Sequence, residues 1–324
     1  MILTVTLNPA LDLTYRVGRL LPHRTHRVSS VDERPGGKGL NVARILHAAG
    51  EPVRATGVLG GDTGARVARL LDRDRIETAF TPIADETRRT VTITDCDATG
   101  FWEPGPTVTP AEWGAFRARY LRLLGSVSVV VLSGSLPRGL PVDAYARLIA
   151  DATAAGVRTV LDTSGDALRA GVAAGPDLVK PNTEELVALV HGAPDARPPR
   201  AAADEGAVAR LAALADAARA LGAGAVVASA GPDGLVAVTA EGSWHARPPE
   251  VVTGNPTGAG DAYDAALARG LRDRTPWPTV LADAVALSAS AVAVAVAGAV
   301  DPSVAARLRP SVSVTPVLEE HPAC

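Results

Sequence analysis

Hydrophobic and polar positions follow two alternating patterns along most of the chain. Short β-branched runs, among them 2–7, 53–60, 127–134, 157–164, 177–182 and 225–231, are separated by Ala-, Leu- and Arg-rich stretches whose apolar residues recur with a helical period. The clearest helical stretches are 39–50, 63–75, 142–156 and 207–224. Repeated strand and helix units of this kind predict an α/β fold around a mainly parallel sheet.

Several of the predicted strands end at polar or small residues. These residues are Ser133, Asp162, Asn182 and Ser229. In an open α/β sheet, ligands bind beside the carboxyl ends of the strands. We therefore expect these side chains to face one common crevice.

Two regions, 13–33 and 87–109, break the alternation. Both show apolar residues at every second position, as in "TRRTVTITD" from Thr87, without a convincing helix between their strands. We expect them to pair as a small sheet that covers the crevice as a lid, within one domain over 1–324 whose core is the remainder. The Pro- and Ala-rich segment 191–206 has no apolar periodicity, and we expect a mobile surface loop there.

Charge and cysteine content narrow the class of protein. The 32 basic and 35 acidic residues form no long single-sign block, which argues against nucleic acid as a partner. The two cysteines, Cys96 and Cys324, indicate neither a disulfide framework nor a thiolate metal site. The most apolar segment, from Leu287, is too short to span a bilayer, and the chain opens on a strand-like run without a basic leader. We expect a soluble cytoplasmic protein with no membrane partner.

A compositional bias marks the candidate functional residues. The chain has 30 Arg but only two Lys, four Asn and no Gln. The six rare residues fall in four segments: "TLNPALD", "GGKGLN", "KPN" and "GNPTGAGD". Asn is common in turns for structural reasons. The clustering nevertheless favours roles that Arg, Asp or Ser cannot fill.

The segment "VVTGNPTGAGDAYDAALARGL", from Val251, passes from a strand-like start through a glycine loop into a helix expected to begin at about Asp261. The first turn of a helix offers unpaired N–H groups and the positive end of its dipole. The amides of Gly258, Ala259 and Gly260 are therefore predicted to hold an anion. No Gly-Lys-Ser/Thr follows, so this is not a Walker A loop.

Asp261 has two interpretations of about equal weight at this stage. It could be a helix N-cap, a common position for Asp. It could instead be the general base of phosphoryl transfer to an alcohol, which needs a group to orient the hydroxyl and take its proton. We expect the positive helix end to keep it ionised.

The second cluster is "ERPGGKGLNVARIL", from Glu33. The glycine pair lets the backbone approach a ligand closely, and the apolar spacing that follows puts Lys38 and Asn41 at a helix start. Amides and an Asn suit a polyol. The structural alternative is a glycine turn with a solvated lysine, but one of only two lysines in the chain lies here.

Further polar residues follow other strands. Asp12 lies just beyond a Pro turn, where a carboxylate could accept hydrogen bonds from two sugar hydroxyls, although a surface turn is the simpler interpretation. Ser133 is predicted to lie on the substrate side. Glu185 follows "VKPN" and could hold Mg²⁺ through water, or be an ordinary first-turn glutamate. The six histidines show no metal-like pairing, which argues against zinc.

With these segments in order, the chain resembles the ribokinase-like PfkB carbohydrate kinases, in particular their 1-phosphofructokinase and tagatose-6-phosphate kinase branch. The motifs are "TLNPALD", "PGGKGLNVAR", "ETR", "SGSLP", "VKPN", "SAGPDG" and "NPTGAGDA". The resemblance implies a three-layer αβα core with a mainly parallel sheet and a small β-sheet lid. It also implies ATP and Mg²⁺ as cofactors, and a possible homodimer formed through the lid.

The resemblance also implies a role for each matching residue. Asp261 would be the catalytic base, and Gly258, Ala259 and Gly260 the anion hole. The sugar would be held by Asp12, Gly37, Lys38 and Asn41, and the nucleotide and Mg²⁺ side would comprise Lys180, Asn182, Glu185, Ser229, Gly231 and Gly234.

Two arginines are candidates for gripping a substrate phosphate. Arg27 and Arg88 lie in the two predicted lid regions, and a guanidinium can bind phosphate through two hydrogen bonds. With 30 arginines in the chain, a solvated surface position is a serious alternative for either. Lys38 would be a third contact.

The function predicted from these residues is ATP-dependent phosphorylation of a ketohexose phosphate, most simply fructose 1-phosphate to fructose 1,6-bisphosphate. Tagatose 6-phosphate and fructose 6-phosphate stay open as substrates, as does an unphosphorylated sugar. A non-catalytic sugar-phosphate sensor would need a broken base or anion hole, and neither is visible. An NAD-dependent oxidoreductase is disfavoured because no G-x-G-x-x-G follows the first strand.

Overall fold

The computed structural model describes residues 1–192 and 205–317. The surface loop predicted at 191–206 therefore lies almost wholly outside the described residues. Within the two described ranges, no helix combines the length and the apolar character that crossing a bilayer requires.

The core is a large sheet. Its strands are β1 Ile2–Thr6, β4 Val53–Gly60, β5 Glu77–Thr78, β6 Thr81–Ile83, β9 Val129–Ser133, β10 Arg158–Asp162, β11 Leu178–Val179, β12 Ala225–Ser229, β13 Leu235–Thr239, β14 Gly242–Arg247 and β15 Ser313–Pro316. Their order is β15-β14-β13-β12-β11-β10-β9-β1-β4-β5, and β6 also pairs with β4. Pairing is parallel from β12 to β5 and β6, and antiparallel only among β12 to β15. The predicted mainly parallel sheet is confirmed.

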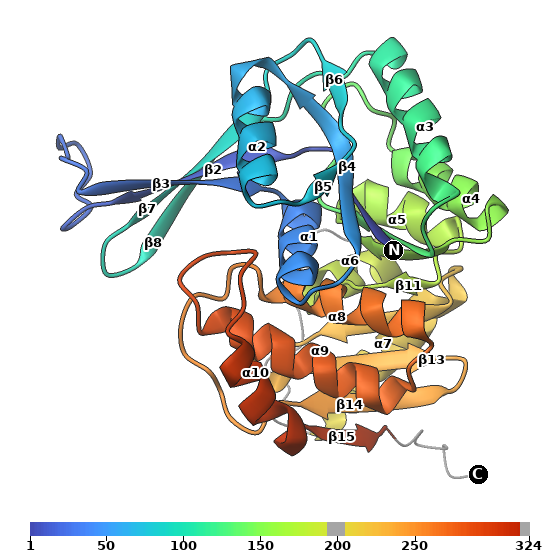
Figure 1. The fold of residues 1–324 in the computed structure, drawn as a ribbon. Helices are drawn as coiled ribbons and strands as arrows, with labels where there is room; N and C mark the ends of the chain where they lie inside the picture. Colours follow the sequence, from blue (N-terminus) through green and yellow to red (C-terminus); the bar gives the residue numbers. More distant parts are fainter. Residues whose placement is uncertain (193–204, 318–324) are drawn as a thin grey trace, which may run out of the picture.

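Helices cover both faces of this sheet (Figure 1). They are α1 Lys38–Ala48, α2 Gly61–Arg73, α3 Pro110–Leu124, α4 Ala144–Ala154, α5 Gly165–Ala173, α6 Thr183–His191, α7 Glu205–Ala220, α8 Ala259–Asp273, α9 Trp277–Val292 and α10 Pro302–Leu308, with short 3₁₀ turns η1 Gly231–Asp233 and η2 Arg309–Ser311. One buried apolar cluster joins the sheet to α1, α2, α8 and α9, and a second joins it to α3, α4, α5, α6 and α7. The three-layer αβα prediction is therefore confirmed.

A smaller sheet projects from one side of the core (Figure 1). Its strands are β2 Ala10–Arg16, β3 Ser30–Gly36, β7 Arg88–Thr94 and β8 Ala98–Trp102, in the order β3-β2-β7-β8. Both regions that broke the sequence pattern supply strands to it. The strands extend beyond the expected 13–33 to Ala10 and Gly36, whereas the second region leaves the sheet at Trp102 and leads into α3, which Thr109 caps.

The two sheets are joined where β3 ends and α1 begins. Gly37 has φ 107° and stands at the N-cap of α1, a backbone conformation that L side chains rarely adopt. A Cβ on Gly36 would lie 2.1 Å from Cγ of Asp12 on the neighbouring strand. The glycine pair thus allows the chain to turn sharply from the small sheet into α1, beside the carboxyl ends of the large sheet.

Candidate active site

The polar residues predicted at the strand ends do lie at one edge of the large sheet. Ser133 and Asp162 are paired neighbours at the ends of β9 and β10. Lys180 follows directly after β11, and Asn182 forms a parallel bridge with Ser229 at the end of β12. Because parallel strands end on the same side, these residues lie at one edge of the sheet. That their side chains face one common crevice stays a prediction.

Asp261 lies in the first turn of α8 and does not cap it. The helix begins at Ala259, two residues earlier than expected, and its N-cap is Gly258. The Asp261 carboxylate instead accepts a hydrogen bond from Nδ2 of Asn41 at 2.8 Å, across 220 residues of sequence, and the residue is 5% exposed. The N-cap interpretation is therefore wrong, because Asp261 is the third residue of the helix and no side chain caps the helix end.

The charge state of Asp261 also differs from the expectation. Burial, with the nearby carboxylate of Asp162 as a second cause, raises the pKa of Asp261 to about 7. The hydrogen bond from Asn41 and the charges of the two lysines act in the opposite direction. The helix end alone therefore does not keep Asp261 ionised, and its pKa lies close to neutral pH, where a general base works best.

The loop before α8 presents backbone amides beside Asp261. Gly258 has φ 90°, and a Cβ there would lie 3.0 Å from Cα of Ala297. Ala259 N–H already donates to the Pro256 carbonyl at 3.1 Å, while the N–H groups of Gly258 and Gly260 have no hydrogen-bond partner within the described residues. Two of the three predicted amides are thus free for an anion in this conformation.

Asn255 holds the glycine loop in place, a role that its sequence position did not reveal. Its Nδ2 donates to the Ala295 carbonyl at 3.0 Å, and its Oδ1 accepts from Thr257 N–H at 3.0 Å. An Asp at this position would lose the amide donor. This explains why one of the rare asparagines stands in this loop.

Two lysines converge on Asp162. Lys38 Nζ lies 3.0 Å from Asp162 Oδ1, and Lys180 Nζ lies 3.4 Å from Asp162 Oδ2. Burial opposes both charges of the Lys180 and Asp162 pair, but their attraction prevails: the pKa of Asp162 falls below its usual range and that of Lys180 rises above it. Burial likewise opposes the charge of Lys38, yet Asp162 keeps its pKa raised.

The two lysines differ in access to the crevice. The side chain of Lys38 is 42% exposed, whereas that of Lys180 is 5% exposed. Lys180 Nζ lies 3.5 Å from the position that a Cβ on Gly260 would occupy. The buried Lys180 therefore packs against the glycine loop at Gly260, whereas the ammonium of Lys38 remains accessible to a ligand.

Asp12 and Arg88 lie together at the base of the small sheet. Thr90 Oγ1 donates to Asp12, and Arg88 donates to the Asn8 carbonyl from Nη2 at 3.2 Å and from Nε at 3.3 Å. Burial raises the pKa of Asp12 despite Thr90 and Arg88, and burial lowers the pKa of Arg88 despite Asp12. The structure thus brings a carboxylate and a guanidinium close together where the small sheet joins the core.

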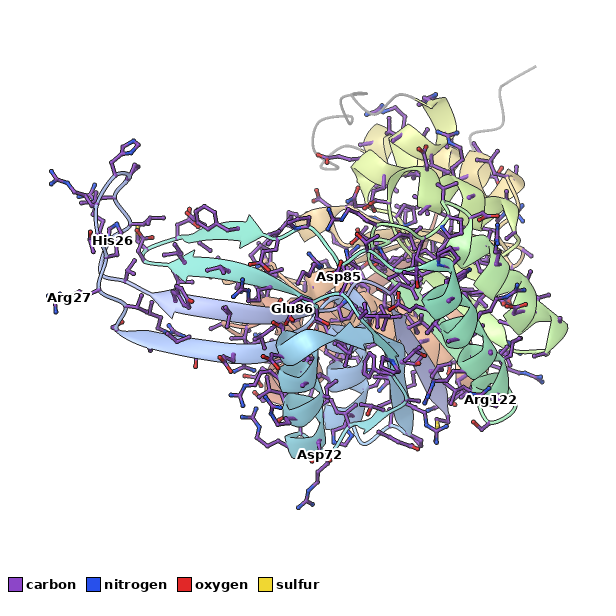
Figure 2. The ribbon with its side chains drawn as sticks, turned by 90° about the horizontal axis from the view of Figure 1, so that it is seen from above. His26, Arg27, Asp72, Asp85, Glu86 and Arg122 are labelled. Atoms are coloured by element: carbon purple, nitrogen blue, oxygen red, sulfur yellow. The ribbon has the colours of Figure 1, made fainter. Side chains whose placement is uncertain are left out.

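Arg27 is not brought to this site within one chain. It lies in the loop between β2 and β3 and is exposed. Figure 2 shows Arg27 at the outer end of the small sheet, on the side away from the core. Of the two arginines proposed for a substrate phosphate, only Arg88 lies near the predicted sugar residues.

Asn182 and Glu185 form a capping box at the start of α6. Asn182 Oδ1 accepts from Glu185 N–H at 2.8 Å, and Glu185 Oε2 accepts from Asn182 N–H at 2.9 Å. These contacts confirm the first-turn interpretation of Glu185. Its Oε1 has no hydrogen bond or ion pair within residues 1–192 and 205–317, so a water-mediated contact to a cation stays compatible with the cap.

An apolar cavity of about 550 Å³ opens beside the glycine loop. Its walls include Ser229 and Gly231 from one side and Ala259, Gly260 and Tyr263 from α8. Two residues predicted on the nucleotide side, Ser229 and Gly231, thus share one cavity with Ala259 and Gly260 of the predicted anion hole.

Gly234 does not line this cavity, although the sequence placed it on the nucleotide side. It has φ 88°, and a Cβ at this position would lie 2.0 Å from the Ala246 carbonyl oxygen. Gly234 therefore serves the tight turn between β12 and β13, where no larger residue fits.

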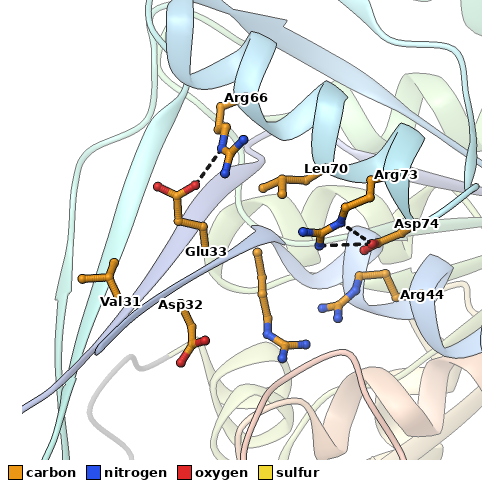
Figure 3. A pocket seen from close by; sticks show the side chains of 9 residues that line it. Val31, Asp32, Glu33, Arg44, Arg66, Leu70, Arg73 and Asp74 are labelled. Carbon is orange, nitrogen blue, oxygen red and sulfur yellow. Dashed lines mark hydrogen bonds and ion pairs between the residues drawn. The ribbon is translucent and has the colours of Figure 1, made fainter. Parts of the chain in front are cut away.

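A second cavity, of about 600 Å³, lies at the outer edge of β3 and not at the strand ends (Figure 3). Four of the residues around it are arginines, but Arg66 pairs with Glu33 and Arg73 pairs with Asp74. Of the other two arginines, Arg44 donates a hydrogen bond to the Ala297 carbonyl at 3.1 Å. None of the predicted substrate residues lines this cavity.

The sequence patterns missed two aspartates of the site. Asp162 was noted only as a strand end, and Asp264 was not singled out. Asp264 lies one helical turn after Asp261, is fully buried, and its Oδ1 is 3.9 Å from Lys180 Nζ. One signal in the sequence could have found Asp264: it is a second acid, three residues after Asp261, on a helix whose neighbouring small apolar residues are expected to pack against the sheet.

Comparisons with known proteins agree with this geometry. A family model described as pfkB family carbohydrate kinase matches residues 5–304. Phosphofructokinase-2 of Escherichia coli, solved in complex with potassium, is 28% identical with a TM-score of 0.85, over 96% of this chain and 98% of that chain. A possible 1-phosphofructokinase of Thermotoga maritima is 27% identical with a TM-score of 0.79, over 97% and 99%. Arabidopsis thaliana ribokinase, at 19% identity and a TM-score of 0.71 over 95% and 98%, shares the fold.

Proposed function

The chain belongs to the PfkB family of carbohydrate kinases, which makes it a phosphotransferase, and we propose that it transfers the γ-phosphoryl group of ATP to a hydroxyl of a ketohexose phosphate. The observation that supports this best is the buried Asp261, oriented by Asn41 at 2.8 Å beside the free N–H groups of Gly258 and Gly260. A base and an anion hole side by side are what in-line transfer to an alcohol requires.

Asp261 acts on the acceptor hydroxyl. Its pKa of about 7 leaves a substantial ionised fraction at neutral pH, so the carboxylate can accept the proton as the oxygen attacks. Asn41 fixes one carboxylate oxygen, and the other is left to orient the hydroxyl. The amides of Gly258 and Gly260 stabilise negative charge that develops on the transferred group.

The base of the nucleotide would lie in the apolar cavity. That cavity of about 550 Å³ meets the glycine loop at Ala259 and Gly260, so a base in the cavity brings phosphates to the free amides. Asn182 borders the same edge through its bridge to Ser229. Mg²⁺ held through water by Glu185 would neutralise phosphate charge when bound, which agrees with the preference of Mg²⁺ for retained waters.

The phosphate already on the sugar would lie near Lys38 and Arg88, with Asp12 and Asn41 binding hydroxyls. Lys38 keeps its ammonium partly exposed, and Arg88 has a half-buried guanidinium near Asp12. Ser133 Oγ is buried without a hydrogen-bond partner within the described residues, so it is a further candidate contact to the sugar.

Fructose 1-phosphate is the preferred substrate, with fructose 1,6-bisphosphate as the product. The order of the sequence motifs and the similarity to the possible 1-phosphofructokinase of T. maritima support this choice. Fructose 6-phosphate is the second candidate, because E. coli phosphofructokinase-2, solved with fructose 6-phosphate, is also 28% identical. Tagatose 6-phosphate belongs to the same chemistry.

Arg27 could contribute only across an interface between copies. Its exposed position at the outer end of the small sheet agrees with a homodimer formed through that sheet, which would act as the lid. Val31 and Phe101, which the strand register puts on one face of this sheet, are 54% and 56% exposed, and a second copy would cover them. Trp102, which is 78% exposed, lies on the opposite face.

The test is a steady-state comparison of kcat/KM for fructose 1-phosphate, fructose 6-phosphate and tagatose 6-phosphate, with ribose and a nucleoside as unphosphorylated controls. We expect fructose 1-phosphate to be the best substrate by at least about tenfold. If an unphosphorylated acceptor is preferred to all three, the roles of Lys38, Arg88 and Arg27 are wrong. Binding of a sugar phosphate without any ATP turnover would indicate a sensor and contradict the proposal.

A further inference from the structure

Asp264 is a buried acid that the proposed transfer does not use. It is fully buried, and neither carboxylate oxygen has a hydrogen-bond donor within the described residues. An ionised carboxylate in such a place would be costly, because desolvation of an unpaired charge is among the largest penalties in a protein interior. The residue therefore either has a cation partner or is not ionised.

The charged groups around Asp264 disfavour its ionised form. Asp162 on β10 and Asp261 on α8 each place a carboxylate oxygen within 4.8 Å of one of Asp264. Lys180 is the ammonium that faces it, at 3.9 Å, and already lies closer to Asp162, at 3.4 Å. Lys38 from α1 and Glu185 from α6 act on the same group of charges from the crevice side.

The balance of charges in this cluster favours a protonated Asp264. With Asp162 and Asp261 ionised, their two charges already match the two lysines, even before Glu185 is counted. An ionised Asp264 would therefore add an unbalanced negative charge to a buried cluster. Two carboxylates that share a site cannot both ionise readily, and one of them keeps its proton. Burial is the main cause that raises the pKa of Asp264 well above its usual range, while Asp162, stabilised by both lysines, stays ionised.

We propose that Asp264 is a positioning residue of the phosphoryl transfer, held as a neutral carboxylic acid that donates a hydrogen bond to Asp162. That bond holds Oδ2 of Asp162, which has Lys180 Nζ at 3.4 Å but accepts no hydrogen bond within the described residues, while Lys38 donates to Oδ1. The carboxylate thus stays fixed between the two lysines. Lys38 then keeps its place at the crevice, and Lys180 its place below Gly260. The kinetic part of this inference rests on the proposed kinase function.

The protonation state can be tested without any substrate. An infrared difference spectrum between the wild type and Asp264→Asn, taken well above pH 7 so that Asp261 is ionised, should show loss of one carboxylic-acid carbonyl band. The matched control is Asp166→Asn, an exposed aspartate in the first turn of α5, which should leave the band unchanged. A wild type without such a band overturns the proposal.

The pH profile separates a neutral Asp264 from a charged one. Asn keeps the neutral charge and a donor, so Asp264→Asn should leave the acid limb of kcat/KM in place and kcat within about threefold of wild type. If Asp264 were charged, removing that charge one turn from Asp261 would shift the acid limb to lower pH. Such a shift contradicts the proposal.

The donor itself is tested by Asp264→Val, which fills similar space without a hydrogen-bond donor. We expect kcat to fall about tenfold with little change in KM for ATP, and Asn to restore it, because a hydrogen bond to an ion is worth roughly that factor. A valine variant as active as wild type overturns the positioning role. If the valine variant does not fold, the Asn profile and the infrared band still decide the proposal.

A cation is the remaining occupant to exclude. Titration of nucleotide-free protein with Mn²⁺ should show no site that disappears in Asp264→Asn; a stoichiometric site lost in that variant would make the three aspartates metal ligands and overturn the proposal. A protein that phosphorylates none of the sugar phosphates but keeps the infrared band would refute the proposed function while supporting the protonated Asp264.

Discussion

Helices α6 and α8 both start at the carboxyl-end edge of the large sheet, yet their first turns are completed in opposite ways. At α6, Asn182 and Glu185 exchange two hydrogen bonds of 2.8 and 2.9 Å, so side chains satisfy the helix end. At α8, the cap is Gly258 with φ 90°, which has no side chain to offer, and Asp261 bonds to Asn41 on another helix.

The difference shows what a functional helix end requires. An acid in the first turn normally bonds to backbone N–H groups, which stabilises the helix and fills the positive end. Where the acid is drawn away by a tertiary contact and the cap is glycine, the N–H groups stay open to a ligand. An acid in the first turn is thus structural at α6 and available for chemistry at α8.

The largest expected effect on activity comes from removing the Asp261 carboxylate from the first turn of α8. Asp261→Asn keeps the shape and an oxygen near Asn41 but loses the base, so kcat should fall about 10²- to 10⁴-fold, while thermal unfolding shows a folded protein. Steady-state kinetics with fructose 1-phosphate and ATP measures this. Turnover within tenfold of wild type would sink the assignment of Asp261 as base.

Replacing the glycine cap should cost stability as well as activity. In Gly258→Ala, the Cβ would lie 3.0 Å from Cα of Ala297 at a φ of 90°, so we expect about 1–3 kcal/mol lower unfolding free energy in urea titrations together with weaker catalysis. Gly50→Ala is the matched control, since its φ is 75° but no atom of the described residues lies within 4 Å of the added Cβ. An equal loss of stability in both variants would show that contact with Ala297 does not matter.

The pH dependence of activity and that of stability should run in opposite directions through Asp261. Its pKa is raised to about 7 from an ordinary 3.8, so kcat/KM should fall about tenfold per unit as pH drops below 7, because the base becomes protonated. The folded protein holds this proton more tightly than the unfolded chain, so the contribution of Asp261 to the unfolding free energy decreases as pH rises from about 4 to 7.

The stability part is measured as the difference between wild type and Asp261→Asn across that range of pH. The difference isolates Asp261 from the other buried acids. A kcat/KM profile that is flat between pH 5 and 8, at saturating Mg²⁺, would be incompatible with Asp261 as the titrating base.

The capped N-terminus of α6 should contribute to stability more than to catalysis. Asn182→Ala removes the cap of α6 and should lower the unfolding free energy by about 1 kcal/mol, as should Thr109→Ala at the equivalent capping box of α3, far from the crevice. Both are measured by chemical denaturation. A fall in kcat for Asn182→Ala as large as that of Asp261→Asn would break the contrast between the two helices.

The smallest effect on stability is expected from Glu185→Gln. Gln can still accept from Asn182 N–H, so the capping box survives and unfolding free energy should change by only a few tenths of a kcal/mol. If Glu185 holds Mg²⁺ through water, the Mg²⁺ concentration for half-maximal rate should rise. An unchanged Mg²⁺ requirement would leave Glu185 with the capping role alone.

Much of the site could be predicted because lysine and asparagine are rare in this chain and several of them lie in the site. In a chain with two lysines and four asparagines, Lys38, Lys180 and Asn41 were informative by rarity alone, and the structure places all three around Asp162 and Asp261. Asp162 and Asp264 could not be found this way, since aspartate is abundant in the chain. Their importance comes from burial and from neighbours that are distant in sequence.

The pattern along the chain determined the αβα core, the small sheet and the edge at which polar strand ends meet, because hydrophobic periodicity and parallel strand direction are local properties with a fixed geometric outcome. Whether Asp261 caps its helix, which arginine reaches the crevice and how the charges of the aspartates and lysines balance were decided by the tertiary structure. Those outcomes depend on close contacts between β10, α1 and α8, and desolvation, which sets the charge states, exists only once these elements have packed together.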